Sequence, residues 1–479
     1  MPIADINPND KWVTDDQGNI IGVDSGGSSG PTLFGTVRSL LDSNGNVVGL
    51  LGPNGEEIPL KRISAALSTL GSRMWGMASV ANSASVWTTY TKQTAECDFD
   101  AVQLVYYHHG ASTPTGMQVI VAATETSKTD SVDNLFEPIV GGTKRQAKDS
   151  TTEQYGWRSV TWGGAASPTI VAAAGYTTPT IAVSDWIPLA SVPRAAGEEN
   201  SLPLIMIRSR VSDAAAQNYY DLGASALMQT ATADNNGRII QTGTTPSDGV
   251  GTINDTNRPA ALGTTRYTPF GIRYRARKSG LCVLGIGSSL VQNQLQVTDS
   301  FSAWGARGCA KASTPNKPIS WWNNGFSSQA SSVFNASGLN TASVMKPNVI
   351  VYEAFSPNDY ATPTAGALRY AIQIGLARAQ SVVEYCNTNR IACILMTGFP
   401  HNNGLSASAD DVRKLCNTQI KAMAAANAVY VFDVDALVTD GASPADFLAA
   451  YDNGDGIHIN NAGNEVVGVA FAELLNGIL

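Results

Sequence analysis

A serine, an aspartate and a histidine in the C-terminal part of the chain have the side chains that nucleophilic acyl transfer needs. Ser289 lies in the small-residue run 285–290, where a tight turn from a strand into a helix would expose its hydroxyl. The chain has four His residues, and His458 follows Asp455 by three positions. An Asp can accept a hydrogen bond from one imidazole nitrogen, which leaves the other nitrogen to face a Ser hydroxyl. Taken separately, a Gly-Ser-Ser run is often a plain loop and an Asp-x-x-His pair is often structural.

Two further residues could stabilise the negative charge that develops on the carbonyl oxygen in such a reaction. Gly325 has no Cβ, so its backbone N–H could closely approach a substrate oxyanion. The side-chain amide of Asn358 could donate to the same oxygen. Each residue also has an ordinary interpretation, with Gly325 in a β-turn and Asn358 and Asp359 as the cap of the next helix.

From residue 281 onward, short apolar runs alternate with helical patterns, and these candidates follow the apolar runs. The pattern predicts strands at 281–287, 318–322, 348–354, 391–397 and 429–434. Between the third and fourth strands, apolar residues recur at helical spacing: Leu368, Ala371, Ile372, Ile374, Leu376, Ala379, Val382 and Val383. Such alternation predicts a parallel α/β sheet with helices on both faces. In these folds the active site gathers at the C-terminal ends of the strands.

The order of Ser, Gly, Asn and Asp-x-x-His along the chain resembles that of the SGNH (GDSL-like) hydrolase family. The resemblance covers residues 281–479 and is most specific at 455–458. Two departures stand out. The family's Gly-Asp-Ser is Gly-Ser-Ser at 287–289 in this chain, and Ser356 replaces a Gly. The first departure leaves Ser288 open as an alternative nucleophile.

The resemblance implies a flavodoxin-like fold and a role for each candidate. Ser289 is expected as the nucleophile, His458 as the general base and Asp455 as the residue that orients the imidazole. The backbone N–H groups of Ser289 and Gly325 and the side chain of Asn358 are expected to form the oxyanion hole. No metal ion and no organic cofactor are implied.

Residues 73–280 have a different sequence pattern, which predicts an antiparallel β-sandwich of jelly-roll type. Runs rich in β-branched and aromatic residues occur at 101–107, 117–122 and 203–208. Clusters of Gly, Pro, Asn and Thr separate them, and no helical period extends over most of the span. The expected domains are therefore 1–72, 73–280 and 281–479.

Residues 1–72 contain a degenerate repeat, in which 16–22 echoes 43–49. Each copy predicts a tight turn followed by a short apolar strand, and 25–31 has the composition of a flexible linker. Such small hairpins bury little surface alone, which favours an attachment or oligomerisation segment over a free domain. The stretch 45–55 resembles segments of phage tail fibre and tailspike proteins.

These resemblances together imply a phage tailspike deacetylase, located in the virion tail, that removes acetyl groups from host polysaccharide. Proteins of that kind are generally trimers, so a homotrimer attached to a phage tail is expected. Two alternatives remain. One is an extracellular bacterial carbohydrate esterase with an accessory sugar-binding domain, and the other is a receptor-binding protein without catalytic activity.

Composition and charge limit the other classes of function. The apolar fraction of 43% and the charged fraction of 15% are typical of a folded protein. A net charge of −8 with scattered Lys and Arg disfavours a nucleic-acid partner. No apolar stretch approaches the length of a membrane span, and the N-terminus lacks the pattern of a signal peptide. The six Cys residues form no CxxC pair, and Cys282, Cys386 and Cys393 are expected to be buried.

Three residues near the predicted strand ends have both a structural and a functional interpretation. His401 follows the fourth strand and could line a substrate pocket, although no acidic partner stands in obvious register. Trp321 and Trp322 end the second strand. They are expected to lie partly in the core, with stacking of one ring on a sugar as the alternative.

Overall fold

The structure is a computed structural model, and the residues that it describes fall into several ranges. These ranges are 11–14, 20–24, 32–33, 38–41, 47–51, 57–58, 69–72, 78–81, 87–108, 116–125, 139–140, 143–144, 156–169, 179–193, 202–211, 218–221, 241–246, 271–292, 303–359, 364–401 and 404–478. The chain divides into two compact units, Met1–Ala65 and Ala66–Leu479.

The first unit contains two small antiparallel sheets. The first has β1 (Lys11–Thr14), β2 (Ile20–Asp24) and β3 (Thr32–Leu33), and the second has β4 (Arg38–Leu41), β5 (Val47–Leu51) and β6 (Glu57–Ile58). β2 and β5 occupy the apolar runs that the repeat predicts, and each pairs with the strand before it. The predicted turns and the predicted linker lie outside the described residues.

The second unit begins with antiparallel sheets. Their strands are β7 (Thr69–Ser72), β8 (Ala78–Ala81), β9 (Trp87–Thr94), β10 (Phe99–His108), β11 (Gln118–Thr124), β12 (Ile139–Val140), β13 (Thr143–Lys144), β14 (Arg158–Ser159), β15 (Thr180–Val183), β16 (Ile187–Pro188), β17 (Leu204–Val211), β18 (Asn218–Asp221), β19 (Gln241–Pro246) and β20 (Gly271–Ala276). One sheet has the order β7-β20-β10-β18-β8, with β15 and β16 also on β10, and another has the order β14-β11-β17-β9-β19. The hydroxyls of Tyr106 in β10 and Ser209 in β17 lie 2.6 Å apart and connect these two sheets. The jelly-roll arrangement stays a prediction, because 222–240 and 247–270, among others, lie outside the described residues.

The boundaries between the units differ from the expected ones. The division falls after Ala65, whereas the N-terminal segment was expected to end at residue 72. β7 pairs with β20 and therefore belongs to a sheet of the second unit. The expected boundary at residue 280, within the second unit, stays a prediction.

The C-terminal region contains a parallel sheet of five strands. They are β21 (Leu281–Gly287), β22 (Ile319–Gly325), β23 (Val349–Glu353), β24 (Ala392–Met396) and β25 (Tyr430–Phe432), in the order β22-β21-β23-β24-β25. Every pairing is parallel, and this is the flavodoxin-like order. All five predicted strands are present, and β21 has the predicted bounds. β22 and β23 are buried along their whole length, as expected for a sheet covered on both faces.

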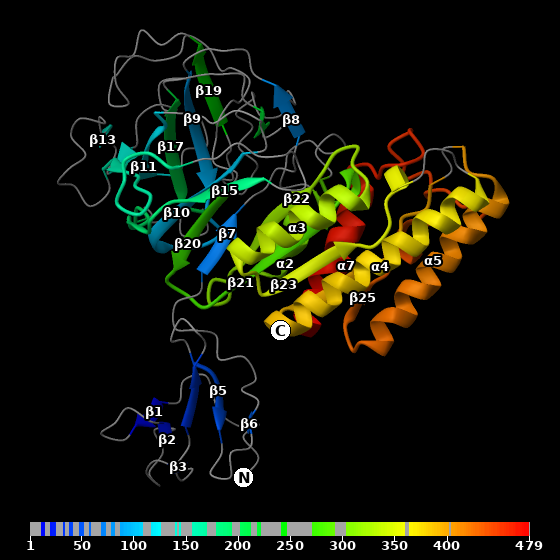
Figure 1. The fold of residues 1–479 in the computed structure, drawn as a ribbon, viewed down its shortest axis with the longest axis horizontal. Coiled ribbons are helices and arrows are strands. Elements are labelled where there is room, and N and C mark those ends of the chain that lie inside the picture. Colours follow the sequence, from blue (N-terminus) through cyan, green and yellow to red (C-terminus); the bar gives the residue numbers. More distant parts are fainter. Residues whose placement is uncertain are drawn as a thin grey trace. The chain divides into compact units, whose positions relative to one another are not determined.

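Helices cover both faces of this sheet (Figure 1). They are α1 (Ser289–Gln292), α2 (Trp304–Ala312), α3 (Ser331–Met345), α4 (Ala365–Asn389), α5 (Ala407–Ala426), α6 (Val434–Val438) and α7 (Asn461–Ile478), with a 3₁₀ turn, η5 (Pro357–Asp359), after β23. α3, α4 and α5 contribute to one apolar cluster, and α2, α6 and α7 contribute to another. α4 is the helix that the sequence predicts, although Ile374 and Leu376 are only half-buried. Cys282, Cys386 and Cys393 are buried, as predicted.

Trp322 joins the parallel sheet to the antiparallel sheet that precedes it. A Cβ at Gly71 or at Gly271 would lie 3.1 Å or 2.1 Å from the Trp322 ring, so the two glycines make room for it. Beside this contact, the Gly71 N–H donates to Ser320 Oγ at 3.2 Å. The ring therefore packs closely against β7 and β20, with no room for a larger side chain at either glycine.

The other tryptophan of β22 lies in the apolar cluster beneath α2 and α7. Trp321 packs against Trp304, with ring centroids 5.6 Å apart, and against Phe471. Trp321 is 1% exposed and Trp322 is 0% exposed. Neither ring is therefore available to stack on a sugar, and both residues belong wholly to the core.

Candidate active site

The turn after β21 carries the candidate nucleophile. β21 ends at Gly287, Ser288 is fully buried, and α1 starts at Ser289, whose side chain is half-buried. A Cβ at Gly287 would lie 2.4 Å from Glu353 Oε2 and 2.4 Å from a methyl group of Val291. Only glycine fits there, because larger residues would displace a buried carboxyl or the first turn of α1.

Tertiary contacts hold α1, which has only four residues. A helix this short is not stable alone, so its surroundings must fix its conformation. Trp304 Nε1 donates to the carbonyl of Leu290 at 3.0 Å, and Asn323 Nδ2 donates to the carbonyl of Gln292 at 3.1 Å. These two bonds satisfy carbonyl groups that a helix end leaves without a partner. The orientation of Ser289 is therefore set by α2 and β22 as well as by its own turn.

The loop between α6 and α7 brings His458 to this turn. His458 Nε2 lies 2.9 Å from Ser289 Oγ. On the other side of the ring, His458 Nδ1 lies 2.7 Å from Asp455 Oδ2. The tautomer that donates from Nδ1 to Asp455 leaves Nε2 as an acceptor for the Ser289 hydroxyl. The structure thus brings Ser289, rather than Ser288, to the imidazole.

Asp455 holds both the ring and the backbone of His458. Its Oδ1 accepts from the backbone N–H groups of Ile457 at 2.9 Å and His458 at 2.8 Å, while Oδ2 faces the ring. Burial acts to raise the pKa of Asp455, but the hydrogen bonds from His458 and Ile457 outweigh it and leave the pKa below the ordinary value. Asp455 therefore stays ionised near neutral pH and can stabilise an imidazolium.

The rest of the motif that follows His458 has a structural role. Asn460 Nδ2 donates to the carbonyls of Ala450 and Asp452, each at 3.0 Å, and so closes the loop. Gly463 N–H donates to Asn460 Oδ1 at 3.0 Å, where α7 begins. A Cβ at Gly463 would lie 2.8 Å from the Cβ of Ile459. These contacts explain why Asn and Gly accompany the Asp-x-x-His sequence.

Gly325 and Asn358 both have protein acceptors in this structure. The Gly325 N–H donates to Asn323 Oδ1 at 2.9 Å. Asn358 Nδ2 lies 3.3 Å from the carbonyl oxygen of Gln329 and 3.2 Å from Ser356 Oγ. A substrate oxyanion would have to compete with these acceptors. The oxyanion role of both residues stays a prediction.

The alternative interpretation of Asn358 and Asp359, as a cap of the next helix, does not hold. The cap of α4 is Thr364, whose side chain accepts from Ala367 N. Asp359 Oδ1 instead accepts from the backbone N–H and the hydroxyl of Ser331, at 2.8 and 2.7 Å, at the start of α3. Asp359 therefore ties the loop after β23 to the preceding helix.

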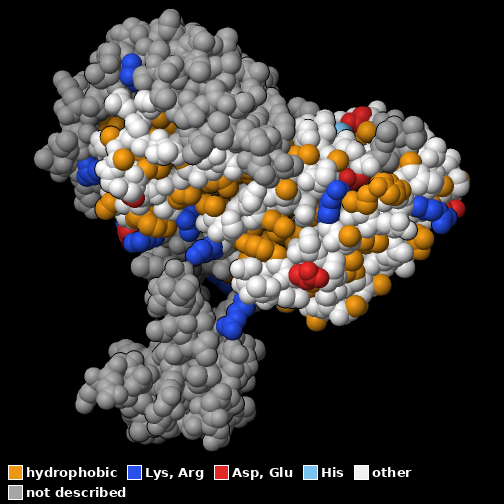
Figure 2. Space-filling view, in the orientation of Figure 1, with side chains coloured by type: hydrophobic (Ala, Val, Ile, Leu, Met, Phe, Trp, Pro, Cys, Tyr) orange, Lys and Arg blue, Asp and Glu red, His pale blue; other side chains and the backbone are white. Residues whose placement is uncertain are grey.

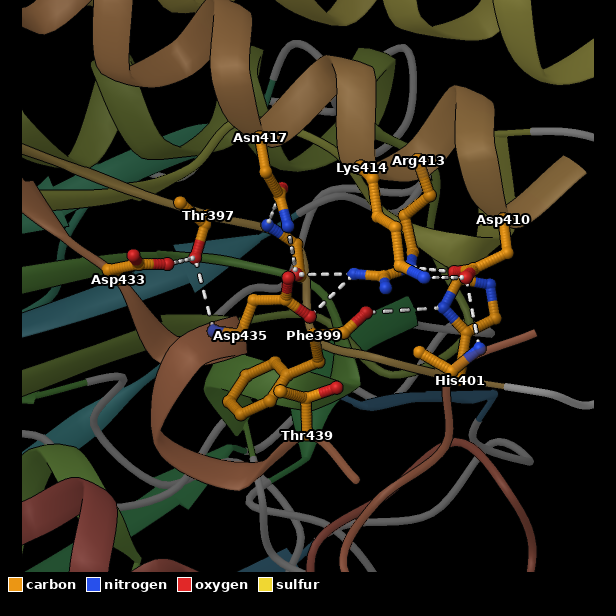
Figure 3. A network of polar contacts seen from close by, with 12 residues as sticks. Thr397, Phe399, His401, Asp410, Arg413, Lys414, Asn417, Asp433, Asp435 and Thr439 are labelled. Carbon is orange, nitrogen blue, oxygen red and sulfur yellow. Dashed lines mark hydrogen bonds and ion pairs between the residues drawn. The ribbon is translucent and has the colours of Figure 1, made fainter. Parts of the chain in front are cut away.

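A buried polar network lies beyond β24, where α5 meets the loops on either side (Figure 3). Arg413 is fully buried; its Nε lies 2.8 Å from Asp410 Oδ1 and its Nη1 lies 2.7 Å from Asp435 Oδ1. Arg413 also donates to the carbonyl of Gly398 at 3.3 Å. Asp410 Oδ2 accepts from Ala445 N at 2.9 Å. The network thus holds the segment that leads into the Asp455–His458 loop.

His401 belongs to the same region and is 3% exposed. Its Nδ1 lies 3.4 Å from the carbonyl oxygen of Phe399 (Figure 3). Burial lowers the pKa of His401 to about 4, so the ring is neutral near pH 7. A side chain this buried does not line an open pocket, which favours the structural interpretation of His401 over the alternative that it lines a substrate pocket.

Glu353 is a residue of this region that the sequence did not reveal, and it is fully buried at the end of β23. Glu353 Oε2 accepts from Ser288 N at 2.6 Å, and Oε1 accepts from Ser288 Oγ at 2.8 Å. Its only signal in the sequence is a carboxylate directly after the apolar run 349–352. The Arg413 network was also missed, since its members are far apart along the chain.

Features of other kinds of site are absent from the described ranges. No group of three or more His, Cys, Asp or Glu side chains in those ranges is placed to hold a metal ion. No helix there combines the length and the apolar character that a membrane span requires. On the face drawn in Figure 2, the Lys and Arg side chains of the described residues are scattered rather than gathered into a stripe.

Solved structures similar to this chain include a GDSL-like lipase from Bacteroides thetaiotaomicron, with 18% identity over 41% of this chain and 88% of that one and a TM-score of 0.31. An acetylxylan esterase from Geobacillus stearothermophilus has 19% identity over 41% of this chain and 94% of that one, with a TM-score of 0.33. A protein assigned to the G-D-S-L lipolytic family from Desulfitobacterium hafniense has 15% identity over 40% of this chain and 98% of that one, with a TM-score of 0.33. No family model and no curated protein matches the chain.

Proposed function

We propose that this protein is a serine carboxylic ester hydrolase with Ser289, His458 and Asp455 as its catalytic residues. The observation that carries the proposal is the continuous chain of contacts from Ser289 Oγ to His458 Nε2, at 2.9 Å, and from His458 Nδ1 to Asp455 Oδ2, at 2.7 Å. A hydroxyl, an imidazole and a carboxylate in this order are the groups that activate a serine for attack on an ester.

In the proposed mechanism, Ser289 Oγ attacks the ester carbonyl carbon while His458 Nε2 takes the hydroxyl proton. The carbonyl π bond opens, and the oxygen carries the negative charge of the tetrahedral intermediate. His458 then gives its proton to the leaving alcohol as the bond between carbon and the alcohol oxygen breaks. Water repeats the sequence on the acyl-enzyme, which releases the acid and restores the Ser289 hydroxyl.

The proposed oxyanion hole consists of the backbone N–H groups of Ser289 and Gly325 with the side-chain amide of Asn358. In this proposal the oxyanion displaces the present acceptors of the Gly325 N–H and the Asn358 amide. Such an exchange is reasonable for Asn358, since both of its present contacts are longer than 3 Å. The negatively charged oxyanion also forms a stronger hydrogen bond than the present neutral acceptors do. One such donor typically stabilises the transition state by about 3 kcal/mol.

We further propose that the substrate is an acetylated polysaccharide and that the protein acts as a phage tailspike deacetylase on capsule or O-antigen. The exposure of the site supports a bulky substrate, since Asp455 is 40% and His458 17% exposed. The hairpin repeats of the first unit support attachment to a larger particle, with a homotrimer in the virion tail. The alternatives are an extracellular bacterial carbohydrate esterase and a receptor-binding protein without activity.

Acetate release tests this proposal. Purified wild-type protein and the Ser289→Ala variant are compared on acetyl-xylan, acetylated capsular polysaccharides and p-nitrophenyl acetate. The proposal expects acetate from at least one polysaccharide with wild type and none above background with the variant. Wild type that is inert on every ester favours the receptor-binding alternative. A monomer in sedimentation experiments contradicts the tailspike assignment while leaving the esterase proposal intact.

A further inference from the structure

We propose that Glu353 is a positioning residue for the nucleophile and that it fixes the turn carrying Ser289 by holding both polar groups of Ser288. This inference rests on the proposed function, because it assigns Glu353 a role in the reaction of Ser289. Glu353 touches neither Ser289 nor His458 through a hydrogen bond, so its effect passes through Ser288 alone.

Both oxygens of the carboxyl group are used, and both are used on the same residue. Oε2 accepts from the backbone N–H of Ser288 at 2.6 Å, and Oε1 accepts from its hydroxyl at 2.8 Å. Two bonds to one residue restrict its rotation as well as its distance, as a bidentate contact does. A Cβ at Gly287 would lie 2.4 Å from the carboxyl, so the preceding residue is also shaped to admit it.

The hydroxyl of Ser288 passes this restraint on to α1. While it donates to Glu353, its oxygen accepts from Leu290 N at 3.3 Å. The carbonyl of Ser288 also accepts from Val291 N at 3.2 Å and from Gln292 N at 2.9 Å. Ser288 is thus the cap of the short helix whose first residue is Ser289. Glu353 determines the direction in which that cap points.

The surroundings of Glu353 make a purely stabilising role a poor explanation. Glu353 is 0% exposed, and in the described part of the chain its polar contacts are the two with Ser288, with no ion pair to Lys, Arg or His. Burial raises the pKa of Glu353 to about 8, the two bonds from Ser288 act in the opposite direction, and nearby Asp359 raises it further. A buried carboxyl without an ion-pair partner costs free energy of folding even when it is hydrogen-bonded, and apolar residues often fill such positions more favourably. A group kept at that cost, beside a candidate nucleophile, is expected to serve the reaction.

Three substitutions and one control test the inference. Glu353→Ala removes both acceptors, and Glu353→Gln keeps one acceptor and offers an amide to the Ser288 oxygen. Ser288→Ala removes the hydroxyl but keeps the backbone N–H. The control is Tyr352→Phe, which changes the neighbouring buried side chain on the other face of β23, where the hydroxyl makes no hydrogen bond.

If Glu353 positions the nucleophile, Glu353→Ala lowers kcat roughly 10- to 100-fold, with KM changed by no more than about two-fold. Glu353→Gln recovers part of the loss, and Ser288→Ala has little further effect once Glu353 has been replaced. Tyr352→Phe leaves kcat and KM at the wild-type values. Assays are run where circular dichroism shows each variant to be folded. A kcat unchanged in Glu353→Gln and Ser288→Ala, whatever the loss of stability, overturns the proposal.

Hydrogen exchange of the peptide 287–292 supplies a second readout that needs no turnover. The inference expects faster exchange in Glu353→Gln and Ser288→Ala than in wild type or Tyr352→Phe. Equal exchange in all four proteins overturns it. If wild type is inert on esters while the exchange rates differ as expected, the proposed function fails and the role of Glu353 in holding the turn stands.

Discussion

Ser289 and His458 lie 169 positions apart in the sequence, and the fold brings the hydroxyl of one to within 2.9 Å of the imidazole of the other. Three elements set this distance. β21 delivers the serine, the loop after α6 delivers the histidine, and Asp455 holds the histidine by its ring and by its backbone.

The three residues of the proposed triad are expected to act as one unit. Ser289→Ala and His458→Ala should each lower kcat by about 10³-fold or more, and the double variant should be no worse than either. Asp455→Asn should also lower kcat, because the amide no longer selects the required tautomer. The control is Asp452→Asn, since Asp452 lies in the same loop and its carboxylate accepts from Gly454 N, away from the His458 ring. Steady-state kinetics on one ester provide the measurement. If the double variant lost as much activity as the two single losses combined, the residues would not act as one unit.

The space that Gly71 and Gly271 leave for the Trp322 ring is expected to tolerate no added methyl group. The Cβ of a Gly271→Ala variant would lie 2.1 Å from the ring, so the free energy of unfolding should fall by about 1–3 kcal/mol. Gly366→Ala is the matched control, because nothing lies within 4 Å of a Cβ at that position in α4. It should be neutral or slightly stabilising. Urea unfolding of both variants tests the difference, and equal stability would argue against tight packing at the junction.

Two basic residues of α5 contact Asp410, and only the buried one is expected to matter for stability. Arg413→Met removes the fully buried guanidinium that pairs with both Asp410 and Asp435, which should cost about 3–5 kcal/mol. Lys414 reaches the other oxygen of Asp410 at 2.8 Å but is 38% exposed, so Lys414→Met should cost less than about 1 kcal/mol. Urea unfolding compares them directly. A larger loss in the Lys414 variant would contradict the role assigned to the network.

Buried His401 predicts a loss of stability in mild acid. Its pKa is about 4 in the folded protein and about 6.5 in an unfolded chain, so between these values only the unfolded chain binds the proton. The contribution of His401 to stability is therefore complete above about pH 6.5 and falls as the pH drops toward 4, by roughly 3 kcal/mol in total. The His401→Gln variant should lose this dependence, whatever its absolute stability. Unfolding at several pH values tests this, and identical pH slopes in the two proteins would contradict it.

Much of the parallel sheet could be predicted because each strand is a short apolar run followed by turn-forming residues. The five strands and α4 follow from periodicity alone, and the first strand was predicted residue by residue. The residues that meet at Ser289 could be proposed because each of them follows one of those strands or precedes the last helix, and because their order resembles a known family. Local patterns sufficed wherever the signal was contained in a few consecutive residues.

The features that the sequence could not supply depend on contacts between distant segments. Glu353 is a single acid after an apolar run, and only the fold shows that it faces Ser288. Trp321 and Trp322 are adjacent and look alike, yet each fills a different core on opposite faces of β22. β7 was assigned to the N-terminal segment because nothing local reveals that its partner is β20, some 200 residues further along the chain.

Covalent labelling with a fluorophosphonate tests the central claim most directly, because this reagent reacts with a serine that a neighbouring base activates. We expect one phosphonyl group per chain, located on Ser289 by peptide mass spectrometry. Labelling should be lost in Ser289→Ala and slowed severely in His458→Ala. A wild-type protein that stays unlabelled, or that carries the adduct on Ser288 instead, would contradict it.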